Sequence, residues 1–110
     1  MSEVLEQLQR LLLIMQEEDE EYQYNTRYAK WVGTHIRIIK LFINMINSHP
    51  APSRKVLRKK AKKITSEATL IAYRYADEDE PPEEWYTAVD ALCAISDVRA
   101  VISGRVYYRK

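Results

Sequence analysis

The sequence has few of the residues on which many catalytic and metal sites depend. Its 110 residues include one cysteine, Cys93, and two histidines, His35 and His49. A single cysteine excludes an internal disulfide framework and a multi-cysteine metal site. Neither histidine has an acid or cysteine nearby at ligand spacing, and no Glu-x-x-His pair suggests a di-iron bundle. We therefore predict no metal, no cofactor and no enzymatic activity.

Glycine and long apolar runs are also scarce. Gly33 and Gly104 stand alone, so a glycine-rich phosphate loop is not predicted. The longest purely apolar run, Leu11 to Met15, is too short to cross a membrane. The N-terminal segment MSEVLEQLQR carries charges where a secretory signal would be apolar. These features predict a cytoplasmic protein with no membrane partner and indicate no small-molecule substrate.

One acidic motif resembles that of an enzyme family. Glu17, Glu18 and Glu21 form the pattern E-E-x-x-E, which is similar to the motif of all-helical nucleotide pyrophosphohydrolases that bind magnesium with carboxylates from two helices. The second acidic element of that family is missing, because residues 27–47 contain no acid. We therefore do not predict this activity. Cys93 lies in the apolar stretch Ala91 to Ile95 and is interpreted as a small core residue.

Prolines in two places divide the chain into helical segments. The sequence H-P-A-P at 49–52 and the sequence D-E-P-P at 79–82 are loops, and the apolar period is helical elsewhere. We predict helices from about Ser2 to near Tyr22, from Thr26 to Asn47, after the cap Ser53, and from Pro82 to Ser103. Gly104 is a left-handed stop. Whether the first two helices are separate or form one rod is left open.

The predicted fold is all-α, a small four-helix up-down bundle over residues 1–104 with a short basic and aromatic C-terminal tail at 105–110. Its core is expected to come from one apolar stripe on each helix. The inward residues are expected to be Val4, Leu5, Leu8, Leu12, Met15, Tyr28, Trp31, Val32, Ile36, Ile39, Phe42, Ile43, Ile46, Leu57, Ala61, Ile64, Ala68, Ile71, Tyr75, Trp85, Val89, Leu92, Ile95 and Ile102.

Charge is balanced in total but uneven along the chain, with 17 Lys+Arg against 16 Asp+Glu and a formal net charge of +1. An up-down bundle gathers most acids at one end and most bases at the other. The acidic end comprises Glu17, Glu18, Asp19, Glu20, Glu21, Asp77, Glu78, Asp79, Glu80, Glu83 and Glu84. The basic end comprises Arg54, Lys55, Arg58, Lys59, Lys60, Lys62, Lys63, Arg99, Arg105, Arg109 and Lys110. The alternative interpretation is ordinary solvated helix faces.

The basic end suits a nucleic-acid backbone, because clustered cations neutralise phosphates without reading sequence. Cations in the first turns of a helix oppose the macrodipole, which favours a role beyond stability. The tail interleaves aromatics with cations, a composition that stacks on unpaired bases; alternatively, Tyr107 packs on the bundle. The predicted nucleic-acid-binding residues are Arg54, Lys55, Arg58, Lys59, Lys62, Lys63, Arg105, Tyr108, Arg109 and Lys110.

The acidic end also carries aromatics with polar groups, which are favoured at protein interfaces. Trp31, Tyr75 and Trp85 are interpreted as capping the core there. The expected partner is a protein or another copy of the chain, docked head to tail. The predicted protein-interface residues are Glu17, Glu18, Glu21, Tyr22, Tyr24, Tyr73, Asp77 and Glu80.

These patterns together predict a non-enzymatic, nucleic-acid-backbone-binding subunit of a larger nucleoprotein assembly. In size, helical content and charge segregation the chain is similar to the small helical subunits of CRISPR effector complexes, and accessory proteins of archaea and their viruses fit as well. No residue is carried over from that similarity. The alternative is a protein–protein adaptor or regulatory subunit with no nucleic-acid role, and a helix-turn-helix DNA reader ranks third. The low glycine and high charge content favour a thermophilic source.

Overall fold

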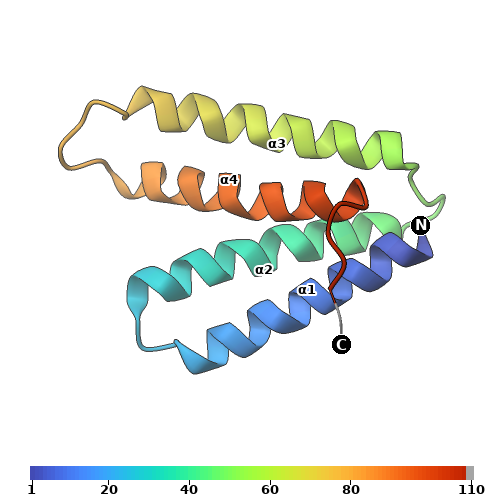
Figure 1. The fold of residues 1–110 in the computed structure, drawn as a ribbon. Helices are drawn as coiled ribbons and strands as arrows, with labels where there is room; N and C mark the ends of the chain where they lie inside the picture. Colours follow the sequence, from blue (N-terminus) through green and yellow to red (C-terminus); the bar gives the residue numbers. More distant parts are fainter. Residues whose placement is uncertain (109–110) are drawn as a thin grey trace.

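The protein is a bundle of four antiparallel helices, as a computed structural model describes it over residues 1–108 (Figure 1). The helices are α1 (Ser2–Glu21), α2 (Thr26–Ile46), α3 (Arg54–Arg74) and α4 (Glu83–Ile102). The chain direction alternates from each helix to the next. The predicted all-α, up-down bundle is therefore confirmed, and a turn at residues 22–25 separates α1 from α2.

The helix ends follow local hydrogen bonding. The Ser53 side chain accepts the Val56 N–H at 3.3 Å, which confirms Ser53 as the cap of α3. Gly104 has a φ of 71°, and its N–H and that of Arg105 donate to the carbonyls of Val101 and Ala100, each at 3.0 Å. This bonding pattern is a Schellman motif, so the predicted left-handed stop is confirmed. Ser2, predicted as a cap, is instead the first helical residue.

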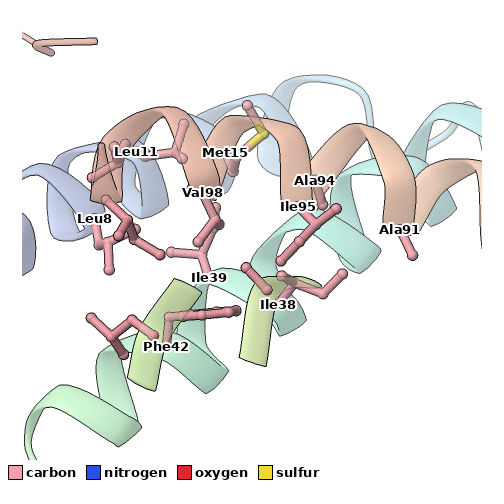
Figure 2. Packing of buried hydrophobic residues seen from close by; sticks show 14 of the residues in the cluster. Leu8, Leu11, Met15, Ile38, Ile39, Phe42, Ala91, Ala94, Ile95 and Val98 are labelled. Carbon is pink, nitrogen blue, oxygen red and sulfur yellow. The ribbon is translucent and has the colours of Figure 1, made fainter. Parts of the chain in front are cut away.

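Most of the core lies between α1, α2 and α4, whose apolar side chains point toward one another in Figure 2, and α3 adds Leu57, Ala61 and Ala68. Leu8 and Leu11 of α1, Ile39 and Phe42 of α2 and Val98 of α4 are all buried there. Within the described chain α3 packs mainly on α4, while α2 lies between α1 and α4. Helices α1 and α3 therefore lie on opposite sides of the bundle, and α3 exposes most of its circumference.

Several predicted inward residues are only half-buried. On α1, Leu11 and Gln7 are buried in place of Leu12. On α4 the buried positions include small residues. Ala88, Ala91 and Ala94 are buried, whereas the larger Trp85, Val89 and Leu92 are half-buried. The prediction for Cys93 is wrong, because this residue lies off the buried stripe of α4 and is exposed. Tyr28, Trp31, Ile36, Ile43, Ile64, Ile71 and Tyr75 are half-buried as well.

None of the four helices, all of whose residues are described, is apolar enough over a sufficient length to span a bilayer.

Candidate nucleic-acid interface

The fold brings the first half of α3 and the last turn of α4 to the same end of the bundle (Figure 1). Seven cations lie between Arg54 and Lys63 on α3, over about 15 Å of helix. Arg99 in the last turn of α4 and Arg105 just after it join them. The predicted basic end is thus brought together over the described residues, whereas Arg109 and Lys110 lie outside the part that the structure describes.

Two adjoining hollows lie between α3 and α4 and share Arg99 and Arg105 in their walls. The larger, about 290 Å³, is also lined by Thr65, Leu92, Ile95 and Ser96. The smaller, about 180 Å³, is also lined by Arg58, Lys62, Ile102 and Ser103. We call the two hollows together the basic groove. Its lining carries four cations and three hydroxyl groups, together with the apolar Leu92, Ile95 and Ile102.

The groove cations are not engaged with carboxylates of the described chain. The ion pairs within residues 1–108 involve Arg10, Arg27, Lys30 and Arg74, and His35 Nε2 lies 3.4 Å from Asp97. None of them includes Arg58, Lys62, Arg99 or Arg105. The cationic side chains of the groove therefore keep their hydrogen-bond donors available for an external anion.

Arg105 is held at the groove by the chain on both of its sides. The Schellman turn at Gly104 precedes it, and the tail after it binds to α1. There the N–H of Tyr108 donates to the side-chain oxygen of Gln7, and Arg10 donates to the carbonyl of Tyr108 at 2.6 Å. The turn and the docked tail together fix the backbone from which Arg105 extends.

The tail aromatics are placed differently from the prediction. Tyr108 packs against the core, and its burial, followed by the charge of Asp97, raises the pKa of its phenol. This packing leaves its ring little freedom to stack on a base. Tyr107, which the alternative interpretation packed on the bundle, is exposed, with the Arg10 guanidinium 5.7 Å from its ring centroid. The available aromatic of the tail is therefore Tyr107, not Tyr108.

A third hollow, between the end of α2 and the start of α3, has a different character. It measures about 650 Å³ and is lined by Met45, Val56, Lys59, Lys60, Lys62, Lys63 and Ser66. The exposed Val56 and the half-buried Met45 give it an apolar floor, and the lysines surround that floor. We call it the lysine-rimmed hollow. Because Lys62 lines both this hollow and the basic groove, the two lie on adjacent sides of α3.

At the opposite end, the structure gathers the predicted acidic residues at the end of α1, in the α3–α4 loop and in the first turn of α4. Two of these carboxylates accept hydrogen bonds from tyrosines. The Tyr28 hydroxyl donates to Glu18, and the Tyr75 hydroxyl donates to Glu84 at 3.0 Å. Glu17, Glu21, Asp77 and Glu80 are exposed. Most of the predicted interface carboxylates therefore face solvent.

The predicted interface tyrosines do not form one patch. Tyr24 is 92% and Tyr73 77% exposed, and Tyr22 is 45% exposed with its edge against the ring of Tyr28. Tyr22 and Tyr24 lie at the α1–α2 turn, whereas Tyr73 lies on α3 at the other side of the bundle. Trp31 packs against the core, as the capping interpretation expects.

Two polar pairs, each with one buried and one exposed side chain, were not predicted. Arg27 donates to Asp90, which is 2% exposed. His35 is fully buried, with Nδ1 3.0 Å from the Trp31 carbonyl and Nε2 3.4 Å from Asp97 Oδ2. Asp90 and Asp97 are two helical turns apart, so both face α2. This spacing was visible in the sequence, but the neighbouring helix that it would face was not.

No cluster of three or more His, Cys, Asp or Glu side chains placed to hold a metal occurs in the described part of the chain. Compared with known protein families, curated protein sequences and solved structures, the chain gives no significant match to any of them.

Proposed function

We propose that this protein is a non-enzymatic subunit that binds the phosphate backbone of nucleic acid through its basic end. Its acidic end then contacts a protein of the same assembly or another copy of the chain. The observation that supports this most directly is the concentration of cations on the first half of α3 and around the basic groove, without carboxylate partners among the described residues.

The location of these cations supports a role in binding rather than in folding. Arg54 and Lys55 occupy the first turn of α3, which contains no acid. Positive charge there opposes the helix macrodipole and costs about 0.3–1 kcal/mol at each position. Repulsion among the neighbouring lysines adds to this cost. An external polyanion removes both penalties when it binds, because it neutralises the cluster and releases its own counterions.

The lysine-rimmed hollow favours a second candidate function, a protein–protein adaptor without a nucleic-acid role. Phosphates do not use an apolar floor such as that of Met45 and Val56. A partner helix with an apolar stripe and acidic flanks would use both the floor and the surrounding lysines. In this alternative the basic end meets an acidic protein surface.

Fluorescence anisotropy with short single-stranded and double-stranded DNA and RNA, measured across a salt series, tests the proposal. We expect binding that weakens steeply with salt. The variant with Lys55, Arg58, Lys59 and Lys62 changed to Glu should lose it. No binding by the unaltered protein, even at low salt, would refute the nucleic-acid function and favour the adaptor.

A matched pair of variants shows whether position or total charge matters. Lys55→Glu/Lys59→Glu reverses two charges at the basic end. Arg37→Glu/Lys40→Glu reverses two exposed charges in the middle of α2. We expect the first variant to lose most of its affinity and the second to lose much less. Equal losses would mean that only the net charge of the molecule matters.

A further inference from the structure

The basic groove differs from the outer face of α3 in shape and in side-chain chemistry. Lys59 and Lys63 line the lysine-rimmed hollow on the adjacent side of α3, which we call the outer face, and neither lines the groove. The groove instead places Arg58 on one wall and Arg99 on the other, with Arg105 at the shared boundary of its hollows. An arginine side chain presents a planar set of donors that bonds two phosphate oxygens at once, whereas lysine acts as a point charge.

Hydroxyl groups complete the set of donors in the groove. Ser96 and Ser103 line its two hollows, and serine hydroxyls commonly donate to phosphate oxygens. Thr65 already donates to the Ala61 carbonyl at 2.9 Å, so it contributes less. Of the apolar residues that line the groove, Leu92 is half-buried, whereas Ile95 and Ile102 are buried beneath the hollows. Leu92 therefore offers the apolar surface for the carbon face of a sugar.

We infer that the basic groove holds the phosphate backbone of a single strand, so that the protein prefers single-stranded to double-stranded nucleic acid. This inference rests on the proposed function. Pockets that enclose a whole small ligand measure about 300–1,000 Å³, and these hollows of about 290 and 180 Å³ are smaller. Each accommodates a phosphate group with part of a sugar, and together they follow a short stretch of strand.

The shape of the groove favours a single strand over a duplex. A duplex carries its phosphates on the outside of a wide cylinder, where they meet an outward-facing surface such as the lysines of α3. A flexible single strand enters a concave groove between two helices, and cationic grooves that follow the backbone are typical of proteins that bind single strands. Tyr107, two residues beyond Arg105, is 63% exposed but lies beside Arg10 of α1 and lines neither hollow, so the inference rests on the groove residues alone.

The test compares two variants that each lose two positive charges from the basic end. Arg58→Gln/Arg99→Gln alters both walls of the groove, and Lys59→Gln/Lys63→Gln alters only the outer face. All four side chains are exposed, so we expect both variants to fold, which circular dichroism and thermal melting verify. The probes are a fluorescein-labelled oligothymidylate, an oligouridylate and a DNA duplex of the same length.

We expect the groove variant to lose about tenfold or more of its affinity for the single strands, because hydrogen bonds to charged groups are removed. Its slope of log affinity against log salt should fall by about 1.4, which is the loss of two contacts on a single strand. The outer-face variant should lose less single-strand affinity. It should also lose at least as much duplex affinity as the groove variant does.

The possible failures are distinguishable. Equal single-strand losses in the two variants, or a preference of the unaltered protein for the duplex, would overturn the inference about the groove and leave the proposed function intact. No binding of any probe by the unaltered protein would overturn both. The inference is supported if the groove variant loses more single-strand affinity than the outer-face variant does.

Discussion

The carboxylate of Asp90 is buried in α4, where the partly exposed Arg27 side chain reaches it from the start of α2. The same guanidinium lies 4.9 Å from the ring centroid of Tyr86. Arg27 is therefore the partner that stabilises the buried negative charge of Asp90. A buried charge without a partner is costly, whereas an exposed ion pair contributes little.

We predict that Arg27→Ala lowers the free energy of unfolding by about 2 kcal/mol, because it leaves the Asp90 carboxylate buried and unpaired. The control is Lys30→Ala on the same helix, which removes an ion pair to Glu83 that is exposed on both sides. That change should cost less than about 0.5 kcal/mol. Urea unfolding measures the free energy of unfolding of both variants. Equal losses would contradict the idea that the burial of Asp90 makes its ion pair important.

Tyr28 makes the stability of the protein pH-dependent in the alkaline range. The hydrogen bond that its hydroxyl donates to Glu18, together with partial burial, raises the pKa of the phenol from 10.0 to about 12. The folded protein holds this proton more tightly than the unfolded chain does. The contribution of this bond to stability is therefore complete below pH 10 and is lost as the pH rises toward about 12.

We expect Glu18→Ala to move the titration of one tyrosine down toward 10.0, the ordinary value. Tyrosinate absorbance measures this shift as a difference between the variant and the unaltered protein. Glu20→Ala, at an exposed position of the same helix, should leave the curve unchanged. Identical curves for the Glu18 variant and the unaltered protein would contradict the assigned bond.

At the scale of the helix, α3 combines a good cap with unfavourable charge. Ser53 caps the helix, yet the first turn contains cations and no acid. We predict that Lys55→Glu raises the free energy of unfolding by about 0.5 kcal/mol, because it restores the charge that the macrodipole favours. The same change should weaken nucleic-acid binding, which would show stability and binding in opposition at one residue.

The comparison is Lys63→Glu, further along the same helix. The macrodipole effect falls off beyond the first turn, so this variant should lose affinity without gaining stability. Chemical denaturation and anisotropy on the two proteins measure the two effects separately. A loss of stability in the Lys55 variant would contradict the proposed conflict between binding and folding.

Helix periodicity was enough to predict the four helices and their antiparallel order, because proline loops and apolar stripes are local features. It did not predict which helices touch. On α4, which packs against both α2 and α3, the small Ala88, Ala91 and Ala94 are buried while the larger Trp85 and Val89 are half-buried. The burial of Gln7 similarly depends on the tail, whose Tyr108 N–H reaches it from the far end of the chain.

The candidate site was predicted in part, for the same reason. The cations of α3 are close in sequence, so their common location follows from one helix. The basic groove requires Arg58 and Arg99 to face each other across two helices, and Arg99 was counted in the basic end without being assigned to a site. The composition of the tail predicts that Tyr108 stacks on bases. Its packing against α1 depends on residues distant in sequence, so the tail sequence does not reveal it.

At the scale of the whole molecule, opposite charges at opposite ends allow copies to associate head to tail. Two complementary variants test this arrangement. Glu17→Gln/Glu20→Gln/Glu21→Gln neutralises exposed acids at one end, and Lys55→Gln/Lys59→Gln/Lys63→Gln neutralises exposed cations at the other.

We predict that neither variant self-associates alone and that their mixture forms one-to-one dimers. A heterologous contact needs one intact end from each copy, and the remaining ends are disabled, so growth stops at the dimer. Light scattering after size exclusion at low salt measures the mass. Dimers of either variant alone would contradict a head-to-tail contact, as would a mixture that stays monomeric.

The long axis of the molecule, 44 Å, is several times the Debye length of about 8 Å at physiological ionic strength. A surface that approaches one end is therefore screened from the charges at the other. At a single neutral pH, a cation exchanger would hold the protein by α3 and an anion exchanger would hold it by the end of α1. The formal net charge of +1 is a sum over the whole molecule that no nearby surface experiences.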